Sequence, residues 1–156
     1  ILEIPIGDVF WLNMMYDSNA FCTSLIVQDE NNNIIHARNL DYGWNDLIVK
    51  LYYDVEVYRN GELLYYGNFL GGFVGLCTGL KPYKFAISGN QRISKGITSD
   101  QQYWQAPLGR LTNLWEFFYN KRIGMLMAHR KVFEEAESYT EAIKMLSEIP
   151  LLSPVY

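Results

Sequence analysis

Two short runs of β-prone residues, separated by a polar segment, stand out in the first third of the chain. Residues 21–28 (FCTSLIVQ) are apolar and rich in β-branched side chains, and residues 34–41 (IIHARNLD) are again β-prone. Between them, residues 29–33 (DENNN) are of the types that tolerate positive φ. This pattern predicts a β-hairpin, with a loop of two or three residues centred on positions 30–32.

The segments on either side of this hairpin predict further elements. Apolar residues recur at helical intervals over residues 9–16, which indicates an amphipathic helix that ends at residues 17–20. Residues 47–58 alternate loosely and lead through Asn60-Gly61, a strong hairpin signal, into a strand over 62–66. Residues 85–88 predict one more strand. The tyrosines of this region favour cross-strand packing, with part of an acyl site as the alternative: Tyr52, Tyr53, Tyr58, Tyr65 and Tyr66.

Glycine is concentrated in residues 67–79, but the spacing does not match a phosphate-binding loop. Close approach of the backbone to a neighbouring strand or a ligand explains these glycines better. Residues 94–105 are polar and irregular, as in a loop. Residues 108–118 and 122–136 carry apolar side chains at three- and four-residue intervals and predict helices. A capping box at Ser138–Glu141 predicts a third helix. Early strands followed by helices indicate one α+β domain.

Composition narrows the classes of function. The chain has 156 residues, of which 49% are hydrophobic, enough for one sizeable core. A net charge of −4 argues against a nucleic-acid partner. No apolar run approaches the roughly 18 residues that span a bilayer. The first residue is Ile1, and no signal segment is present, so we expect an excerpt of a larger precursor.

The cysteines and histidines leave several alternatives open. Two cysteines are too few for a disulfide scaffold, although a Cys22–Cys77 bridge in a purely structural domain is one alternative. Neither His36 nor His129 has a carboxylate or second histidine at metal-ligand spacing, so no metal site is predicted. His129 lies on an apolar helical stripe and is expected in the core or an interface. A Cys-His dyad that uses His36 stays open.

The hairpin gathers three chemically useful groups at one end. In the expected register Cys22 lies opposite residues 39–41, close to the guanidinium of Arg38 and the carboxylate of Asp41. A thiolate, which an adjacent cation stabilises, is the nucleophilic form of cysteine. The turn type decides which of Arg38 and Asp41 shares the face of Cys22. The alternative is a buried cysteine beside an ordinary surface ion pair.

The motifs of this hairpin resemble a known family. Cys22-Thr23-Ser24, Asp29 and residues 36–42 (HARNLDY) are similar to the start of the mature catalytic chain in the acid ceramidase and N-acylethanolamine acid amidase family, which belongs to the choloylglycine-hydrolase-like Ntn cysteine hydrolases. The family places Arg sixteen and Asp nineteen residues after its Cys, as this chain does. The resemblance extends to residues 4–8, 69–79 and 87–92 (ISGNQR) and weakly to the end of the chain.

This resemblance implies a fold and a division of the chain. The expected fold is α+β, a layered αββα sandwich of the Ntn-hydrolase type, present as a fragment. Residues 1–21 would be a helical segment on the propeptide side, and residues 22–156 the N-terminal part of the catalytic domain. Autocatalytic cleavage of a zymogen would fall between Phe21 and Cys22.

The resemblance also implies roles for individual residues. The family uses the thiol of Cys22 as nucleophile and the α-amino group freed by cleavage as base, since such an amine ordinarily titrates near 8. Arg38 would stabilise the thiolate and orient the substrate carbonyl, and Asp41 would hold the new amino group. The expected substrate-binding residues and the fourth catalytic position are Asn39, Tyr42, Asn90 and Gln91.

Function follows from the same resemblance. It implies a lysosomal or secreted amidase that hydrolyses N-acylethanolamines or ceramide at acidic pH through an acyl-enzyme, without metal or cofactor. Its partners would be the fatty-acyl amide and the remaining N- and C-terminal parts of the precursor, and contact with a membrane or lipid surface stays open. The motifs lie slightly nearer the N-acylethanolamine amidase branch.

One departure from the family pattern bears on activity. Gln91 stands where the family has Glu, and an amide can neither offset the charge of Arg38 nor take a proton. The alternative function is therefore a catalytically impaired paralogue that binds lipid or regulates. An Asn that completes the family's oxyanion hole would lie beyond residue 156.

Overall fold

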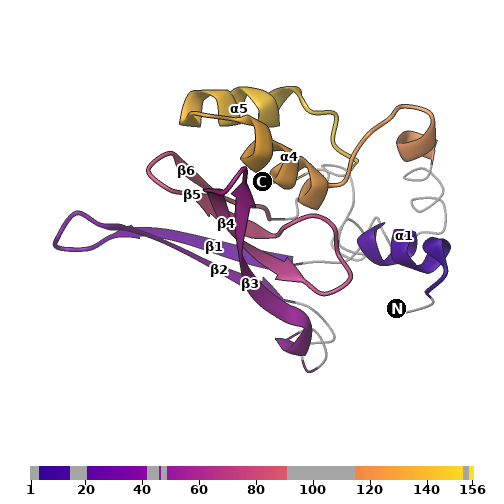
Figure 1. Cartoon of the computed structure of the whole chain (residues 1–156), viewed down its shortest axis with the longest axis horizontal. Coiled ribbons are helices and arrows are strands. Elements are labelled where there is room, and N and C mark those ends of the chain that lie inside the picture. Colours follow the sequence, from indigo (N-terminus) through magenta and orange to yellow (C-terminus); the bar gives the residue numbers. More distant parts are fainter. Residues whose placement is uncertain (1–3, 15–20, 42–45, 47–48, 91–114, 153–154) are drawn as a thin grey trace, which may run out of the picture.

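The computed structural model describes residues 4–14, 21–41, 46, 49–90, 115–152 and 155–156. Two antiparallel sheets are present, a β1-β2 hairpin and a four-stranded sheet in the order β3-β4-β5-β6 (Figure 1). The elements are, in chain order, α1 (Ile6–Met14), β1 (Phe21–Gln28), β2 (Ile34–Asp41), η2 (Val49–Leu51), β3 (Tyr52–Arg59), β4 (Glu62–Leu70), β5 (Thr78–Lys81), β6 (Phe85–Ser88), α4 (Met125–Glu135) and α5 (Tyr139–Glu148).

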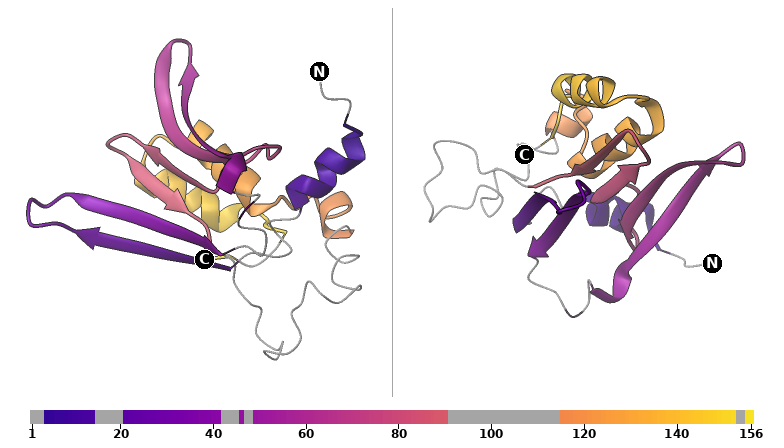
Figure 2. Two further views of the ribbon diagram at one scale, coloured as in Figure 1. Left: turned by 90° about the horizontal axis from the view of Figure 1, so that it is seen from below. Right: turned by 90° about the vertical axis from the view of Figure 1, so that its left-hand side faces the viewer.

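The helices and the two sheets stack in layers (Figures 1 and 2). Phe85 and Ile87 of β6 point toward α4 and pack in one buried cluster with Phe133. Ser88, the next residue along β6, points to the other face and hydrogen bonds to the β1-β2 hairpin. Helices α4 and α5 therefore pack on one side of the four-stranded sheet, and the half of the hairpin nearer Cys22 packs on the other, which confirms the predicted α+β class.

The predicted hairpin is confirmed, and Asp29 determines its turn. The N–H of Asp29 donates to the carbonyl of Asn33 at 3.0 Å, which closes the three-residue loop 30–32. The Asp29 carboxylate accepts from the N–H groups of Asn31 and Asn33, both at 2.8 Å. Asn32 adopts a φ of 65°, as expected for this loop type. The pKa of Asp29 is lowered, mainly by the hydrogen bonds that its carboxylate accepts from Asn33.

The second hairpin also agrees with the sequence. Asn60 and Gly61 both have positive φ, 54° and 85°, as a type I′ turn requires. Strand β4 continues to Leu70, beyond the predicted end at residue 66, because it pairs with β3 as far as Tyr52. Tyr65 packs as expected, since it is fully buried with its ring centroid 5.1 Å from that of Phe133, whereas Tyr53, Tyr58 and Tyr66 are exposed.

Glycines of the segment 67–79 permit close packing, but against helix α4 instead of the neighbouring strand or ligand that was expected. A Cβ at Gly79 would lie 2.9 Å from two ring carbons of Phe133, and a Cβ at Gly75 would overlap the backbone of Leu126. Helix α4 can therefore approach the sheet closely. The sequence analysis did not predict strand β5, which contains Gly79 and forms only because β4 and β6 flank it.

The helices agree with the sequence apart from one boundary. Helix α1 is confirmed, whereas α4 begins at Met125 instead of residue 122, because Ile123 forms a parallel bridge with Leu151. The capping box is confirmed, since Ser138 Oγ accepts from the N–H of Glu141 at 3.2 Å. Of the predicted helix 108–118, residues 115–118 are helical. Residues 108–114 and the predicted loop 94–105 lie outside the described residues.

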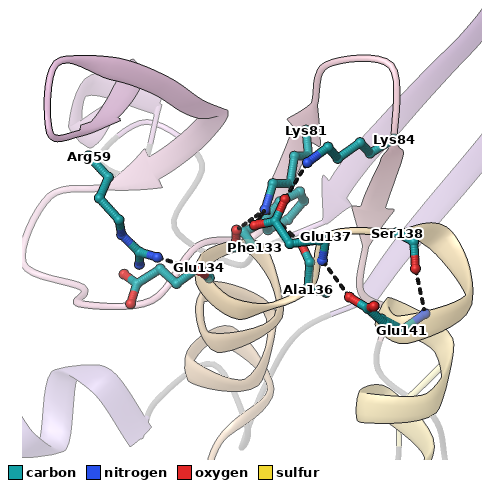
Figure 3. A network of polar contacts seen from close by, with 9 residues as sticks. All are labelled: Arg59, Lys81, Lys84, Phe133, Glu134, Ala136, Glu137, Ser138 and Glu141. Atoms are coloured by element: carbon teal, nitrogen blue, oxygen red, sulfur yellow. Dashed lines mark hydrogen bonds and ion pairs between the residues drawn. The ribbon is translucent and has the colours of Figure 1, made fainter.

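A buried lysine ties the end of α4 to the sheet (Figure 3). Lys81 is 3% exposed, and its Nζ donates to the carbonyl of Ala136 at 2.6 Å and to Glu137 Oε1 at 3.0 Å. Lys84 also pairs with Glu137. The hydrogen bond from Lys84 and, next in effect, that from Lys81 lower the pKa of Glu137 to about 2. The α4–α5 junction therefore depends on an ionised Glu137.

We expect Glu137→Gln to destabilise the protein slightly at neutral pH and not at pH 2. The pKa of Glu137 is lowered from 4.5, so its contribution is present above about pH 4.5 and is lost as pH falls toward 2. The side chain is 60% exposed, so the loss of unfolding free energy stays below about 1 kcal/mol. Urea unfolding across this pH range measures this loss, with Glu148→Gln as the control. If the free energies of unfolding of Glu137→Gln and the wild type differed by the same amount down to pH 2, this role of Glu137 would be wrong.

Candidate active site

The register of the hairpin determines which groups meet. Cys22 pairs with Leu40, Ser24 with Arg38 and Phe21 with Asp41. Directly paired residues of an antiparallel ladder point to the same face, and the faces alternate along each strand. Cys22 and Arg38 therefore share the face that packs on the four-stranded sheet, whereas Asp41 alternates to the other face. This settles the choice that the sequence left open.

Arg38 makes the central contact of the site. Its Nη2 donates to Cys22 Sγ at 3.0 Å, and its Nε donates to the carbonyl oxygen of Gly89 at 3.1 Å. Two bonds from one planar guanidinium fix its orientation. The guanidinium therefore places both a hydrogen-bond donor and a positive charge beside the sulfur, the kind of environment in which nucleophilic cysteines are found. Cys22 is partly buried and packs against the cluster around Cys77.

Gly89 is positioned by the helix layer. It is buried, and a side chain at this position would overlap Met125 and His129 of α4. The absence of a Cβ therefore allows α4 to pack directly behind the carbonyl that accepts from Arg38. In this way the helix supports the arginine through the backbone of one glycine.

A layer of uncharged groups lies near Arg38 on its buried side. Burial raises the pKa of the Cys77 thiol, an effect that Tyr52 and Arg38 partly oppose. Burial likewise raises the pKa of Tyr52, next to Cys77 and Arg38, although its hydroxyl has no hydrogen-bond partner of ordinary geometry among the described residues. Burial, with the charge of Arg38, lowers the pKa of His129 to about 4. All three groups are uncharged at neutral pH, so none of them forms an ion pair with the guanidinium.

Cys22 and Cys77 are not joined by a disulfide, so the bridge considered from the sequence is not formed. Cys77 is 1% exposed, and its raised pKa keeps it protonated at neutral pH. Cys22 is the more accessible of the pair and has the cationic partner. The structure thus distinguishes a partly exposed sulfur with a cationic partner from a buried one.

The two histidines take different places. His129 is 4% exposed, as expected for a core residue. His36 shares the face of Arg38, and its Nε2 bonds to Ser88 Oγ at 2.8 Å rather than forming the Cys-His dyad considered above. Ser88 Oγ also bonds to Ser24 Oγ at 2.7 Å, and Ser24 Oγ donates to Asn90 Oδ1 at 3.1 Å. A row of hydrogen-bonded side chains therefore runs from His36 through Ser88 and Ser24 to Asn90.

Asp41 and Asn39 lie at the same end of the hairpin as Cys22, on its outer face. Both are exposed, and Asn39 Nδ2 donates to Asp41 Oδ1 at 2.7 Å. Asp41 is paired with Phe21, so it stands across from the peptide bond that precedes Cys22. Tyr42 and Gln91, the other two predicted site residues, lie outside the described residues.

Sequence reasoning missed part of this site. Ser24 and Ser88 were given no role, although Ser24 follows Cys22 at a two-residue interval and His36 precedes Arg38 at the same interval. A two-residue repeat of polar side chains on facing strands was the available signal. Among the described residues, no group of three potential metal ligands is present. The described helices also include none long and apolar enough to cross a membrane.

The layered architecture is part of an Ntn-hydrolase fold. It matches a solved structure of a Caenorhabditis elegans N-acylethanolamine-hydrolyzing acid amidase ortholog, with a TM-score of 0.65 and 29% identity, over 85% of this chain and 52% of that chain. The sequence pattern of the linear amide C–N hydrolases, choloylglycine hydrolase family, matches residues 22–156. The chain therefore belongs to this family of amide hydrolases.

Curated relatives agree. N-acylethanolamine-hydrolyzing acid amidase of Cavia porcellus is 35% identical over 155 residues, which cover 99% of this chain. Acid ceramidase of Heterocephalus glaber is 30% identical over 173 residues, which cover the whole chain. The chain spans about 40% of the length of each of these relatives. The resemblance to the ceramidase and acid amidase family is thus confirmed.

Proposed function

We propose that the full-length protein is a cysteine amidase that hydrolyses lipid amides, N-acylethanolamines or ceramide, to a fatty acid and an amine. The observation that carries this proposal is the 3.0 Å contact from Arg38 Nη2 to Cys22 Sγ. The family match begins at residue 22, which supports Cys22 as the first residue of the mature catalytic chain. The names of the relatives support a lipid amide as substrate.

Cleavage of the chain before Cys22 frees the α-amino group of this residue, and the Cys22 thiol itself performs the cleavage. Its sulfur attacks the carbonyl carbon of Phe21, the Phe21–Cys22 C–N bond breaks, and a thioester with a free α-amino group results. Water then hydrolyses the thioester, which leaves a carboxylate on Phe21 and restores the thiol. Asp41 is paired with Phe21, and this position supports a role in holding the new amino group through a charge-assisted hydrogen bond.

Turnover repeats this chemistry on the substrate. The α-amino group takes the thiol proton while the sulfur attacks the amide carbonyl, and the amine leaves with that proton. Water hydrolyses the acyl thioester and releases the fatty acid. Arg38 stabilises the thiolate and directs a donor at the reacting centre, and Asn39, Tyr42 and Asn90 contact the substrate. No metal or cofactor takes part in any of these steps.

The same proposal includes the pH and compartment in which the protein acts and the partners with which it associates. The relatives' names include the word acid, which supports activity at low pH in the lysosome or after secretion. The remaining N- and C-terminal parts of the precursor stay associated with this chain as partners. A lipid substrate also requires the protein to meet a membrane or lipid surface.

Gln91 favours a second candidate, a catalytically impaired paralogue that binds lipid without hydrolysing it. An amide in place of the family's carboxylate leaves the charge of Arg38 less well balanced. Such a protein would retain affinity for fatty amides and keep the bond before Cys22 intact.

One experiment separates the two candidates. We expect that the full-length protein, incubated at low pH with a fatty amide, releases free fatty acid, and that mass spectrometry finds a new chain beginning at Cys22. Fatty-amide binding with neither cleavage nor product would instead establish the paralogue. Neither binding nor hydrolysis would reject both.

A further inference from the structure

A hydrogen-bond chain runs along the buried face of the hairpin, from His36 through Ser88 and Ser24 to Asn90. The distances are 2.8 Å from His36 Nε2 to Ser88 Oγ, 2.7 Å between the hydroxyl oxygens, and 3.1 Å from Ser24 Oγ to Asn90 Oδ1. All four side chains are partly buried. Three strands contribute to this chain, β1, β2 and β6, so it forms only when the two sheets pack.

Counting protons gives the chain a direction. A serine hydroxyl has one proton to donate and lone pairs to accept with. Ser24 uses its proton for Asn90 Oδ1, so the bond between the hydroxyls requires Ser88 as donor. Ser88 has then no proton left for the imidazole, and His36 Nε2 must carry the proton that binds Ser88 Oγ. The chain donates in one direction, from imidazole to amide.

We propose that His36, Ser88 and Ser24 are positioning residues that fix the side-chain amide of Asn90 with Oδ1 inward and Nδ2 outward, as a donor for the carbonyl oxygen of the fatty amide. The inference rests on the proposed function, in which Asn90 contacts the substrate. An amide presents its oxygen and its NH₂ to opposite sides, so an oxygen held by Ser24 leaves the NH₂ facing away from Ser24.

Asn90 is well placed for this role. It follows Gly89, whose carbonyl accepts from Arg38 Nε, and the same arginine donates to Cys22 Sγ. Its backbone is fixed by two hydrogen bonds with Tyr156, of 3.0 and 2.7 Å. The backbone is thus held by one partner and the amide orientation by another. Hydrogen bonds in series polarise one another, so a change in the donor at His36 affects the hydrogen bond to Asn90 at the other end of the chain.

The tautomer of His36 tests the direction without any need for activity. The chain contains two histidines, and His36→Gln assigns their signals in the nitrogen NMR spectrum of the full-length protein. We expect neutral His36 to carry its proton on Nε2. A proton on Nδ1 instead would mean that the chain runs the opposite way, with Nδ2 of Asn90 held inward, and would overturn the inference.

Substrate kinetics tests the consequence. We expect Ser88→Ala to raise KM for a fatty amide about fivefold, the equivalent of one hydrogen bond, while cleavage before Cys22 continues. His36→Gln, whose amide nitrogen can still donate to Ser88, should stay within about twofold of wild type, whereas His36→Leu should match Ser88→Ala. Thr23→Ala, on the opposite face of β1, is the control.

The outcomes are distinguishable. Equal KM values for His36→Leu and the wild type would reject the positioning role while amide hydrolysis itself stands. If the wild type hydrolyses no fatty amide, the proposed function fails, and the tautomer still reports whether the chain has its direction. Thermal unfolding of Ser88→Ala and His36→Leu identifies a loss of folding, and the tautomer of His36 in the wild-type protein then decides.

Discussion

We expect replacement of Cys22 by alanine to abolish amide hydrolysis and to leave the Phe21–Cys22 bond intact. In the proposed mechanism both reactions use the same sulfur, and the other thiol of the chain, Cys77, is buried and protonated, with its pKa raised by that burial. Removal of a catalytic nucleophile in other hydrolases lowers kcat by roughly 10⁶, which is a fall to background. Liquid chromatography of released fatty acid and mass spectrometry of the chain measure the two effects together.

Thr23→Val is the matched control for this variant, because Thr23 is the exposed neighbour of Cys22 on the other face of β1. It should process and turn over as the wild type does. If Cys22→Ala retained processing or hydrolysis above background, the nucleophile would lie elsewhere. Cys22→Ser adds a graded test, since a hydroxyl is the weaker nucleophile and should slow both reactions.

The second large effect is expected at Arg38. Arg38→Met removes the donor to Cys22 Sγ and the donor to the Gly89 carbonyl at once. Loss of one preorganised donor from an active site commonly lowers kcat by about 10²–10³, and we expect at least that here. Arg38→Lys should recover little, because a single ammonium cannot reproduce the fork that holds both contacts.

Arg59→Met controls for loss of an arginine as such. Arg59 donates to the carbonyl of Glu134 at 2.9 Å, at the end of α4, so its replacement should change stability and not turnover. Thermal unfolding of each variant separates folding from chemistry. A folded Arg38→Met protein with wild-type kcat would show that the guanidinium serves packing only.

Local signals predicted most of the fold. Alternating β-branched runs around residues 29–33 gave the first hairpin, and Asn60-Gly61 gave the second, because in each case turn chemistry and strand pattern lie within a few residues of each other. The start of α4 could not be predicted in the same way. Ile123 would fit a helix, but its backbone hydrogen bonds to Pro150 and Leu152, which lie far along the chain.

The sequence predicted the proximity of Cys22 and Arg38 but not the geometry of the residues around them. Residue type and spacing singled out Cys22 and Arg38, and the structure joins them directly. Spacing could not place Asp41 on the outer face, because one residue of register reverses every side chain of a strand. Ser88 and Cys77 reach the site only through packing of the second sheet, a contact that no local pattern encodes.

The acyl-enzyme is the most direct test of the central claim, that Cys22 attacks the amide carbonyl. Full-length protein is mixed with a fatty amide at low pH, quenched with acid within one turnover and digested for mass spectrometry. The account predicts a peptide that begins at Cys22 and carries one fatty-acyl group on its sulfur. Turnover with the Phe21–Cys22 bond intact, or an acyl group on any other residue, would contradict it.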